Sequence, residues 1–428
     1  MVEVENKLQR YDSYKDSGVE WLGEIPEHWE LTRLGTRFKE RKTKVSDKDF
    51  PPLSVTKNGT VPQLANAAKS NDGDNRKLVK KGDFAINSRS DRKGSSGIAY
   101  QDGSVSLIYI VMEPLNIHPI YCNYLLKSYN FIEEFYRMGH GIVADLWTTR
   151  YDEMKAIMVG IPPLSEQTKI AQFLDDKTTK IEDAIAIKEQ QINLLKERKQ
   201  ILIHKAVTRG LDDRVKLKDS GVEWIGEIPD HWEVKRLKNV CYINRNSLTE
   251  TTNKDFRFRY VDIGSVSLED GIVETEEFLF KNSPSRARRI AKPGDTVIST
   301  VRTYLKAIDF VNEEKSKYIY STGFAVLEPE SFIYPEFLAN FVRSDAFTEQ
   351  VTINSKGMSY PAINSTDLSR LFVVHSSISE QKEISAYIET SSQKIEKAIG
   401  LKQQEIDRLK EYKSSLINGV VTGKVKVC

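Results

Sequence analysis

KDSGVEWLGEIPEHWE, residues 15–30, returns as KDSGVEWIGEIPDHWE at residues 218–233. The shift is 203 residues, and 14 of the 16 positions are identical. A second pair of segments, residues 164–208 and 378–422, shares 20 of 45 positions. Between the paired segments the similarity falls to short fragments. The sequence of 428 residues is therefore an internal duplication, in which each half has a constant frame, a variable module and a repeated C-terminal segment.

Both repeated C-terminal segments are predicted to be long helices. Their apolar residues recur at intervals of three, four and seven, which is typical of a coiled-coil seam. The residues expected at the interface between the two helices are Ile181, Ile185, Ile192, Leu195, Leu202, Ile395, Ile399, Ile406, Leu409 and Leu416. Ser165 and Ser379, each just before Glu-Gln, are predicted to cap the helix starts. A helix with one exposed apolar stripe needs a partner, so the duplication predicts an antiparallel pair, with Met1 and Cys428 at the same end.

The modules are predicted to be mixed α/β. Residues 106–113 and 295–301 have the composition of strands, and residues 121–138 and 335–351 have that of amphipathic helices. The predicted fold class is α/β (α+β), with two similar modules joined by two long antiparallel helices in a pseudo-twofold repeat. The predicted boundaries are 1–160 for the first frame and module, 161–213 for the first helix, 214–374 for the second frame and module, and 375–428 for the second helix.

Composition excludes several classes of protein. The longest apolar run, Leu107 to Met112, is far shorter than the roughly 20 residues that span a bilayer. The N-terminus has no hydrophobic stretch typical of a signal peptide. Three cysteines, far apart in the sequence, indicate neither a disulfide framework nor a zinc site. We therefore expect a cytoplasmic protein that has no contact with membranes.

The net charge of +2 conceals strongly basic windows. Residues 33–44 and 76–93 each carry +5, and residues 281–306 carry +6. In each module one basic window contains a Gly-Asp turn, at Gly82-Asp83 and Gly294-Asp295. Such clusters neutralise phosphates, and their matching positions favour a DNA interface over ordinary solvated loops. The residues predicted to contact DNA are Arg41, Lys42, Asn87, Ser88, Arg89, Arg92, Lys93, Arg286, Arg288, Ser299, Thr300, Arg302, Tyr304, Lys356 and Tyr360.

Sequence signatures of catalysis are missing. The glycines at 419 and 423 have the wrong spacing for a phosphate-binding P-loop, and there is no dinucleotide-binding fingerprint. The Pro-Pro pairs at 51–52 and 162–163 lack the flanking residues of an adenine methyltransferase motif. A Pro-Asp and Glu-x-Lys arrangement at 229–235 is too short for a nuclease site, and the first frame lacks its lysine. The sequence therefore predicts no catalytic residue and no metal site.

These features resemble the specificity subunit of type I restriction–modification enzymes. The resemblance rests on the duplicated Asp-Ser-Gly-Val-Glu-Trp frame, the duplicated Ser-Glu-Gln-x-x-Ile helix starts and the Val-Thr endings, and it extends from about residue 15 to 425. Residues 360–364 of the second module, Tyr-Pro-Ala-Ile-Asn, also fit the family pattern. The resemblance implies a non-catalytic subunit with two target recognition domains. Each of them would read one half of a split, asymmetric site in double-stranded DNA.

The resemblance also implies partners for this chain. The two helices would fix the spacer between the half-sites and dock two methyltransferase subunits, and restriction–translocation subunits would complete the complex. S-adenosylmethionine, ATP and magnesium would belong to those partners, leaving no cofactor on this chain. The frames and helices would be alike because they hold two copies of the same partner.

Two other interpretations stay open. The helices alone would permit a non-catalytic scaffold or adaptor protein, although the matched basic loops disfavour it. A self-contained restriction enzyme is disfavoured by the missing catalytic motifs.

Overall fold

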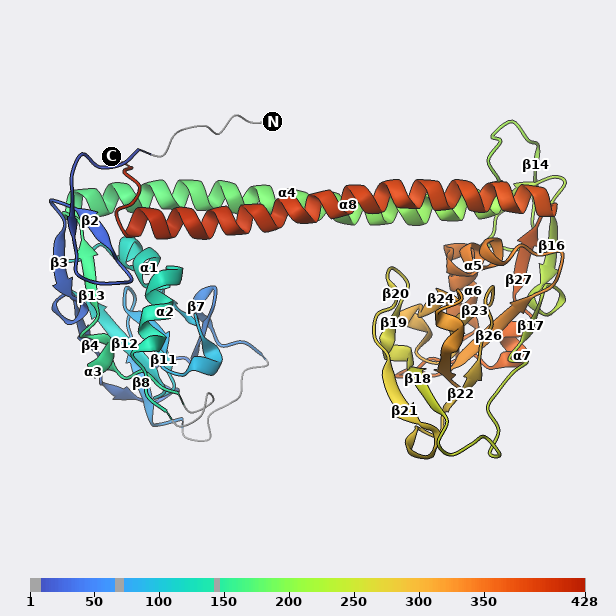
Figure 1. Ribbon diagram of the computed structural model, residues 1–428, viewed down its shortest axis with the longest axis horizontal. Helices are drawn as coiled ribbons and strands as arrows, with labels where there is room; N and C mark the ends of the chain where they lie inside the picture. The colour runs from blue at the N-terminus through green and yellow to red at the C-terminus, as the bar shows by residue number, and fades with distance from the viewer. Residues whose placement is uncertain (1–8, 66–72, 142–146, 428) are drawn as a thin grey trace. The chain divides into compact units, whose positions relative to one another are not determined.

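The computed structural model describes residues 9–65, 73–141 and 147–427. The chain forms two compact units (Figure 1). Unit 1 consists of residues 1–189 and 403–428, and unit 2 of residues 190–402. Each unit therefore contains one module and a portion of both long helices.

The core of unit 1 is a four-stranded antiparallel sheet in the order β10-β9-β12-β4. Its strands are β4 (Phe38–Glu40), β9 (Phe84–Asn87), β10 (Ser96–Ile98) and β12 (Tyr109–Pro114). The smaller sheets pair β1 (Tyr14–Asp16) with β2 (Glu24–Pro26), β3 (Glu30–Arg33) with β13 (Met158–Ile161), β6 (Leu53–Thr56) with β7 (Gly59–Pro62), and β8 (Arg76–Val79) with both β5 (Lys44–Val45) and β11 (Gly103–Val105). The short helices are α1 (Pro119–Lys127), α2 (Tyr129–Arg137) and α3 (Tyr151–Met154).

Unit 2 repeats this core sheet in the order β24-β23-β26-β17. Its strands are β17 (Cys241–Ile243), β23 (Thr296–Ser299), β24 (Ile308–Phe310) and β26 (Phe324–Pro329). Two frame pairs recur as β14 (Leu217–Asp219) with β15 (Glu227–Pro229) and β16 (Glu233–Arg236) with β27 (Phe372–His375). The helices recur as α5 (Pro335–Arg343), α6 (Asp345–Asn354) and α7 (Ser365–Ser369). The predicted mixed α/β class and internal repeat are therefore confirmed, and the repeat extends through the modules.

The two units differ in their second sheets. Unit 2 has a four-stranded sheet, β21 (Glu276–Leu279), β18 (Arg257–Val261), β25 (Tyr318–Ser321) and β22 (Ala287–Ile290), and a small hairpin of β19 (Val266–Ser267) and β20 (Gly271–Ile272). In the described part of unit 1, the corresponding sheet has three strands, in the order β11-β8-β5. The variation between the modules is thus concentrated outside a common core sheet.

Each predicted module helix is two helices. A serine breaks both pairs at the same place, Ser128 between α1 and α2 and Ser344 between α5 and α6. Both serines have extended backbone, and each hydroxyl donates to a carbonyl three residues earlier at 2.7 Å. Hydrophobic periodicity does not reveal this break, because a single serine is tolerated within a helix.

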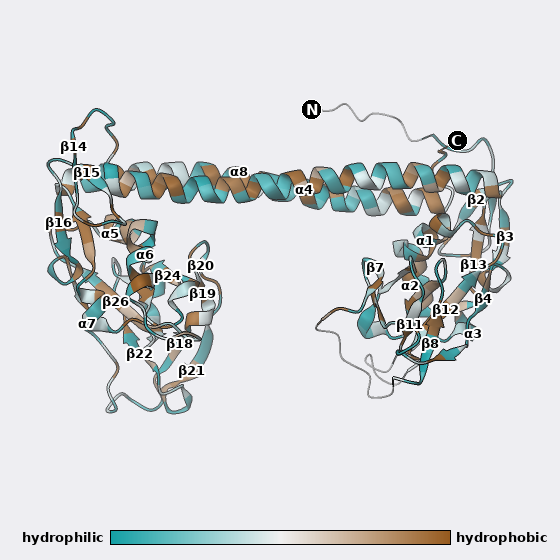
Figure 2. Ribbon diagram, turned by 180° about the vertical axis from the view of Figure 1, so that it is seen from behind, coloured by the Kyte–Doolittle hydropathy of each residue, from teal (hydrophilic) through white to brown (hydrophobic). Residues whose placement is uncertain are grey.

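The long helices are α4 (Leu164–Arg209), of 46 residues, and α8 (Ile378–Val421), of 44 residues. Hydrophobic and hydrophilic residues alternate along both (Figure 2). The prediction that Ser165 and Ser379 cap them is wrong, because both serines lie inside the first helical turn. The hydroxyl of Ser377, one residue ahead of α8, accepts a backbone N–H of the first turn.

Two ion pairs in unit 1 show that α4 and α8 run antiparallel there, as predicted. Lys188 of α4 binds Glu405 of α8 at 2.5 Å, while Glu182, earlier in α4, binds Lys413, later in α8. In unit 2, Lys199 of α4 binds Glu396 of α8 at 2.7 Å. All ten residues predicted at the helix interface are buried or partly buried. The most buried of them are Ile406 and Leu416.

A glutamate joins each frame hairpin to the start of a long helix: Glu166, which is buried, in unit 1 and Glu380, which is partly buried, in unit 2. Glu166 accepts hydrogen bonds from the Trp29 indole at 3.1 Å and the Tyr11 hydroxyl at 2.5 Å, and its other oxygen lies 2.8 Å from His28 Nε2. In unit 2, both Glu380 oxygens lie 3.0 Å from their partners, the indole nitrogen of Trp232 and the Nε2 of His231. We call this arrangement the glutamate clasp.

The glutamine that follows each glutamate holds the module. Gln167 accepts the backbone N–H of His118 at 2.8 Å, just ahead of α1. Gln381 accepts that of Tyr334 at 2.7 Å, just ahead of α5. The repeated Ser-Glu-Gln therefore connects hairpin, long helix and module in both units.

The predicted Gly-Asp turns are present and lead into β9 and β23. Gly82 and Gly294 have positive φ angles of 91° and 94°, which side-chain-bearing residues rarely adopt. The carboxylate of Asp83 is bound by the Arg41 guanidinium at 2.6 and 3.0 Å. Asp295 has no such partner among the described residues, and burial raises its pKa to about 6.

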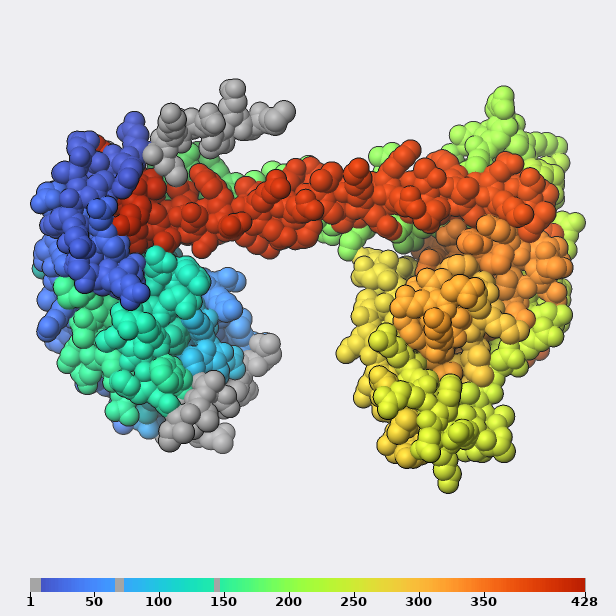
Figure 3. All heavy atoms as spheres, viewed as in Figure 1, coloured from blue at the N-terminus to red at the C-terminus, as the bar shows by residue number. Residues whose placement is uncertain are grey.

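The C-terminal segment packs on the N-terminal hairpin in unit 1 (Figure 3). Lys426 donates its backbone N–H to the Gln9 carbonyl at 2.8 Å, and the Lys424 ammonium donates to the Glu24 carbonyl. Met1 and Cys428 themselves lie outside the described residues. The adjacency of the Gln9 and Lys426 segments agrees with the expectation that the two ends of the chain lie close together.

We predict that Glu166→Gln lowers the free energy of unfolding by about 1–3 kcal/mol, because an amide nitrogen would then face buried donors. Chemical denaturation with circular dichroism detection measures the change. Glu182→Gln is the control, since Glu182 pairs with Lys413 at the surface and should cost less than about 1 kcal/mol. Equal losses in the two variants would contradict a structural role for the clasp.

We predict that Asp295→Asn becomes more stabilising, relative to wild type, as the pH rises. The carboxyl pKa is about 6 in the fold and about 4 in unfolded chains, so ionisation penalises the folded state progressively between those pH values. Above pH 6 the penalty is on the order of 3 kcal/mol. Calorimetric unfolding at pH 4 and pH 7.5 would measure it. Asp83→Asn should instead destabilise at pH 7.5, because it removes the buried carboxylate that binds Arg41 through two hydrogen bonds. The same sign for both variants would refute this assignment.

Candidate nucleic-acid interface

Unit 1 carries a basic hollow of about 770 Å³ beside the end of β9. The charged residues of its lining are four bases and one acid: Lys57, Arg76, Arg89, Arg92 and Asp91. Arg76 is buried, and its guanidinium donates to the Ser104 hydroxyl at 2.8 Å. Burial lowers the pKa of Arg76, but arginine stays protonated in proteins at neutral pH. The hollow is therefore suited to a phosphate backbone.

The loop after β9 divides into a buried support and an exposed tip. Asn87 and Ser88 are buried, and the Asn87 side chain accepts the Arg89 N–H at 2.9 Å. The Ser88 carbonyl accepts the Thr149 N–H at 2.9 Å. Arg89 is exposed, and it lines a second hollow of about 360 Å³ as well as the first. Asn87 and Ser88 thus hold the loop, while Arg89 is available to a ligand.

Unit 2 brings two predicted segments together after β23. The backbone of Ile363 donates to the Thr300 carbonyl at 2.8 Å, which ties the segment after β23 to the one before α7. The Arg302 guanidinium lies 5.2 Å from the ring centroid of Tyr360, a cation–π arrangement. Arg302, Tyr304 and Tyr360 are all exposed. An exposed arginine beside two exposed tyrosines is a surface typical of nucleic-acid contacts.

The backbone around Arg302 adopts an uncommon conformation. Arg302 and Lys306 both have positive φ angles, 51° and 46°, and flank a short 3₁₀ turn. Non-glycine residues rarely occupy this region, and such strain clusters at functional sites. Ser299 and Thr300, ahead of the turn, are buried, and the Thr300 hydroxyl donates to the Gly323 carbonyl at 2.9 Å. As in unit 1, the buried residues support an exposed arginine.

Seven of the predicted basic residues have an acidic neighbour. The pairs are Arg41 with Asp83, Lys42 with Glu40, Arg92 with Asp91, Lys93 with Glu133, Arg286 with Asp262, Arg288 with Glu250 and Lys356 with Asp367. Arg41 has two acidic partners, because its guanidinium also lies 3.2 Å from the Glu113 carboxylate. Within the described ranges, Arg89 and Arg302 are the predicted bases with no ion pair.

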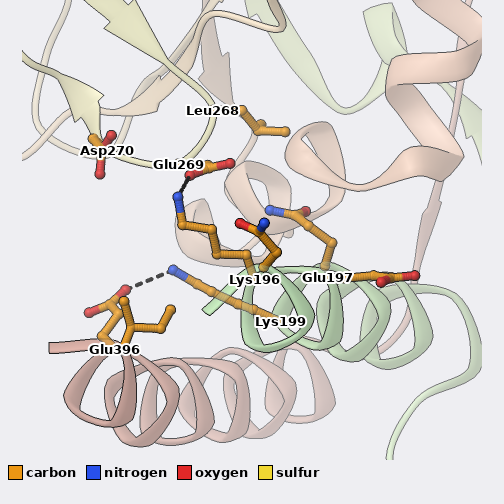
Figure 4. A pocket seen from close by; sticks show the side chains of 10 residues that line it. Lys196, Glu197, Lys199, Leu268, Glu269, Asp270 and Glu396 are labelled. Carbon is orange, nitrogen blue, oxygen red and sulfur yellow. Dashed lines mark hydrogen bonds and ion pairs between the residues drawn. The ribbon is translucent and has the colours of Figure 1, made fainter. Parts of the chain in front are cut away.

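Another hollow in unit 2, of about 490 Å³, lies between the long helices and the β19–β20 hairpin (Figure 4). Lys196 binds Glu269 across it, and Lys199 binds Glu396 at 2.7 Å. Both lysines that line it are therefore neutralised, and it is a weaker candidate for phosphate binding than the surface around Arg302.

The structure adds residues that we did not predict, namely Lys57, Arg76 and Tyr109 in the basic hollow of unit 1. Arg76 lies within the basic window 76–93, so its charge was visible in the sequence. Lys57 lies on the β6–β7 connection, outside the basic windows, so no local sequence pattern indicated a role for it. Within the described residues, there is no cluster of three or more potential metal ligands and no helix long and apolar enough to cross a membrane.

Comparisons with known proteins agree with one another. The type I restriction modification DNA specificity domain family matches residues 26–197 and 229–410. The putative type I restriction enzyme MjaX specificity subunit of Methanocaldococcus jannaschii is 24% identical over 433 residues, covering 95% of this chain and 96% of the relative. The MjaVIII specificity subunit of the same organism is 25% identical, and 94% of each chain is covered.

Solved structures share the fold. A chain from a study of complex assembly and conformational transition in the type I R-M system has a TM-score of 0.67 at 16% identity, covering 93% of this chain and 98% of that one. The HsdS subunit from Thermoanaerobacter tengcongensis has a TM-score of 0.52 at 18% identity, covering 94% and 98%. Since the family match covers both halves of the duplication, the chain belongs to the specificity subunits of type I restriction–modification systems, which are non-catalytic DNA-recognition subunits.

Proposed function

We propose that each module reads one half of a bipartite, asymmetric site in double-stranded DNA. The two long helices set the spacer between the halves and dock two methyltransferase subunits. Restriction–translocation subunits complete the complex, which acts in the cytoplasm. S-adenosylmethionine, ATP and magnesium are bound by those partners.

One observation carries the proposal for DNA. In both units, the first strand after the Gly-Asp turn ends in a loop with buried polar residues and an exposed arginine, Arg89 after β9 and Arg302 after β23. Neither arginine has an ion pair with a residue that the structure describes. Arginine pairs with guanine edges in the major groove and with phosphates. The two loops occupy the same place in a duplicated sheet but have different neighbouring side chains. They are therefore suited to two different half-sites.

The decisive experiment is a base-resolution adenine-methylation map of the host genome, with and without this gene. We expect one bipartite motif to disappear when the gene is deleted. Replacing residues 31–160 with the equivalent module of a related subunit should change one half of that motif and leave the other half and the spacer intact. An altered second half would contradict independent reading by the two modules, and an unchanged methylation map on deletion would contradict the proposed function.

Arg302→Ala should weaken binding to the cognate site by about 1–3 kcal/mol and relax selectivity at one base position. Fluorescence anisotropy with the assembled methyltransferase complex, at several salt concentrations, would measure both effects. Arg257→Ala is the matched control, because Arg257 is exposed in the same unit but paired with Glu277 on β21. Wild-type affinity and selectivity in Arg302→Ala would show that this side chain does not contact the DNA.

A further inference from the structure

The frame hairpin keeps identical surface residues in both copies. Seven of its positions are exposed in both units, and six of the seven are identical. These six are Asp16/Asp219, Gly18/Gly221, Glu20/Glu223, Glu24/Glu227, His28/His231 and Glu30/Glu233. Packing explains identity at buried positions, but exposed positions tolerate change unless something else constrains them.

Five of the six identical positions have a role inside the chain. Each aspartate accepts the N–H of the glycine two residues later at 2.9 Å, and each glycine has a positive φ. Both histidines belong to the glutamate clasp. The other two glutamate pairs have basic neighbours: Arg10 for Glu24, Arg209 for Glu227, Arg37 for Glu30 and Lys235 for Glu233. The position of Glu20 and Glu223 is the remaining one, and among the described residues neither carboxylate has a hydrogen bond or ion pair.

Both glutamates lie beside a half-buried tryptophan in the same backbone turn. In the first copy the N–H groups of Leu22 and Gly23 bond to one carbonyl, that of Val19, and the second copy repeats this arrangement. Trp21 packs edge-on against Phe131 of α2, with ring centroids 6.2 Å apart. We call residues 18–23 and 221–226 the Glu–Trp turns.

Each Glu–Trp turn forms one wall of a hollow in its own unit. The hollow has about 700 Å³ in unit 1, where α2 supplies another wall, and about 400 Å³ in unit 2, where α6 does. In unit 1, Arg137 of α2 is bound by Glu134 at 2.7 and 2.8 Å, and Lys93 by Glu133 at 2.6 Å. The bases of this hollow are thus paired with other acids. Among the described residues, the Glu20 carboxylate has no hydrogen bond or ion pair of its own and interacts with Arg137 only through longer-range electrostatic attraction. The buried indole N–H of Trp21 also has no acceptor among the described residues.

The charge of the hairpin argues against nucleic acid as the ligand. Each copy carries five acidic residues and one lysine, so it would repel a phosphate backbone. A protein with an exposed basic side chain is complementary to it. Arginine suits the site best, because its guanidinium pairs with a carboxylate in a bidentate fashion and stacks on aromatic rings.

We propose that the two Glu–Trp turns are equivalent docking points for one partner protein bound in two copies, each inserting a basic side chain between the glutamate and the tryptophan. This inference rests on the proposed function in taking that partner to be the methyltransferase subunit. It explains why an exposed glutamate without an internal role occurs unchanged in both halves.

The test is the stoichiometry of complexes formed with the cognate methyltransferase subunit, measured by native mass spectrometry, with affinities from calorimetry. Wild type should bind two copies. Glu20→Lys and Glu223→Lys should each bind one copy tightly and the other about tenfold or more weakly, since an attractive pair becomes repulsive. The double variant should lose both, and Glu20→Gln should weaken binding in the same direction.

Glu27→Lys and Asp230→Lys are the matched controls, because these exposed acids of the same hairpin lie outside both hollows. They should retain two copies at near wild-type affinity. Equal weakening by the controls, or two tightly bound copies in the Glu20 and Glu223 variants with wild-type circular dichroism and melting, would overturn the docking assignment alone. A wild-type chain that binds no methyltransferase subunit would overturn the proposed function itself.

Discussion

The glutamate clasp is the interaction on which both units depend. A carboxylate in the first turn of a helix is stabilised by the positive end of the helix dipole, and here it also binds buried side chains of the frame. The next residue, a glutamine, binds the backbone at the start of a module helix. Two adjacent side chains therefore set the direction in which each long helix leaves its module. The frame hairpin is needed because it supplies the hydrogen-bond donors for a carboxylate that is buried in unit 1 and partly buried in unit 2.

Features that depend on local sequence could be predicted, whereas the clasp, which joins distant residues, could not. The repeated frame, the seam of the helices and the Gly-Asp turns follow from local pattern and periodicity, and the structure contains all three. The clasp itself could not be predicted, because His28 and Glu166 are 138 residues apart and each looks unremarkable alone. The breaks at Ser128 and Ser344 do not follow from the sequence, because a single serine is tolerated within a helix. Ser165 was predicted to cap the helix because the helix was expected to begin after it, whereas α4 begins at Leu164.

The candidate interface was predictable only at the level of loops. Positive windows and Gly-Asp turns located the segments after β9 and β23, but not the burial of Asn87 or Ser299. Whether a basic side chain is neutralised depends on residues that are distant in the sequence. Arg41, for example, is paired with Asp83, 42 positions away, so its charge is compensated within the fold. The scaffold thus separates two roles. A common core sheet holds the loops, and side chains outside that sheet differ around Arg89 and Arg302, as is usual where recognition is carried by loops on a rigid support.

Unit 1 is assembled from both ends of the sequence, whereas unit 2 is a single continuous stretch, residues 190–402. Leu416, Val420 and Val425 belong to the same apolar cluster as Trp29 and Ile25. During synthesis on the ribosome, unit 2 therefore has all its core residues before unit 1 does, although unit 1 begins first. Part of the apolar surface of the first module therefore stays uncovered until the C-terminal residues are made. A chain shortened by a few dozen residues at its C-terminal side would have an incomplete core in unit 1 and a complete core in unit 2.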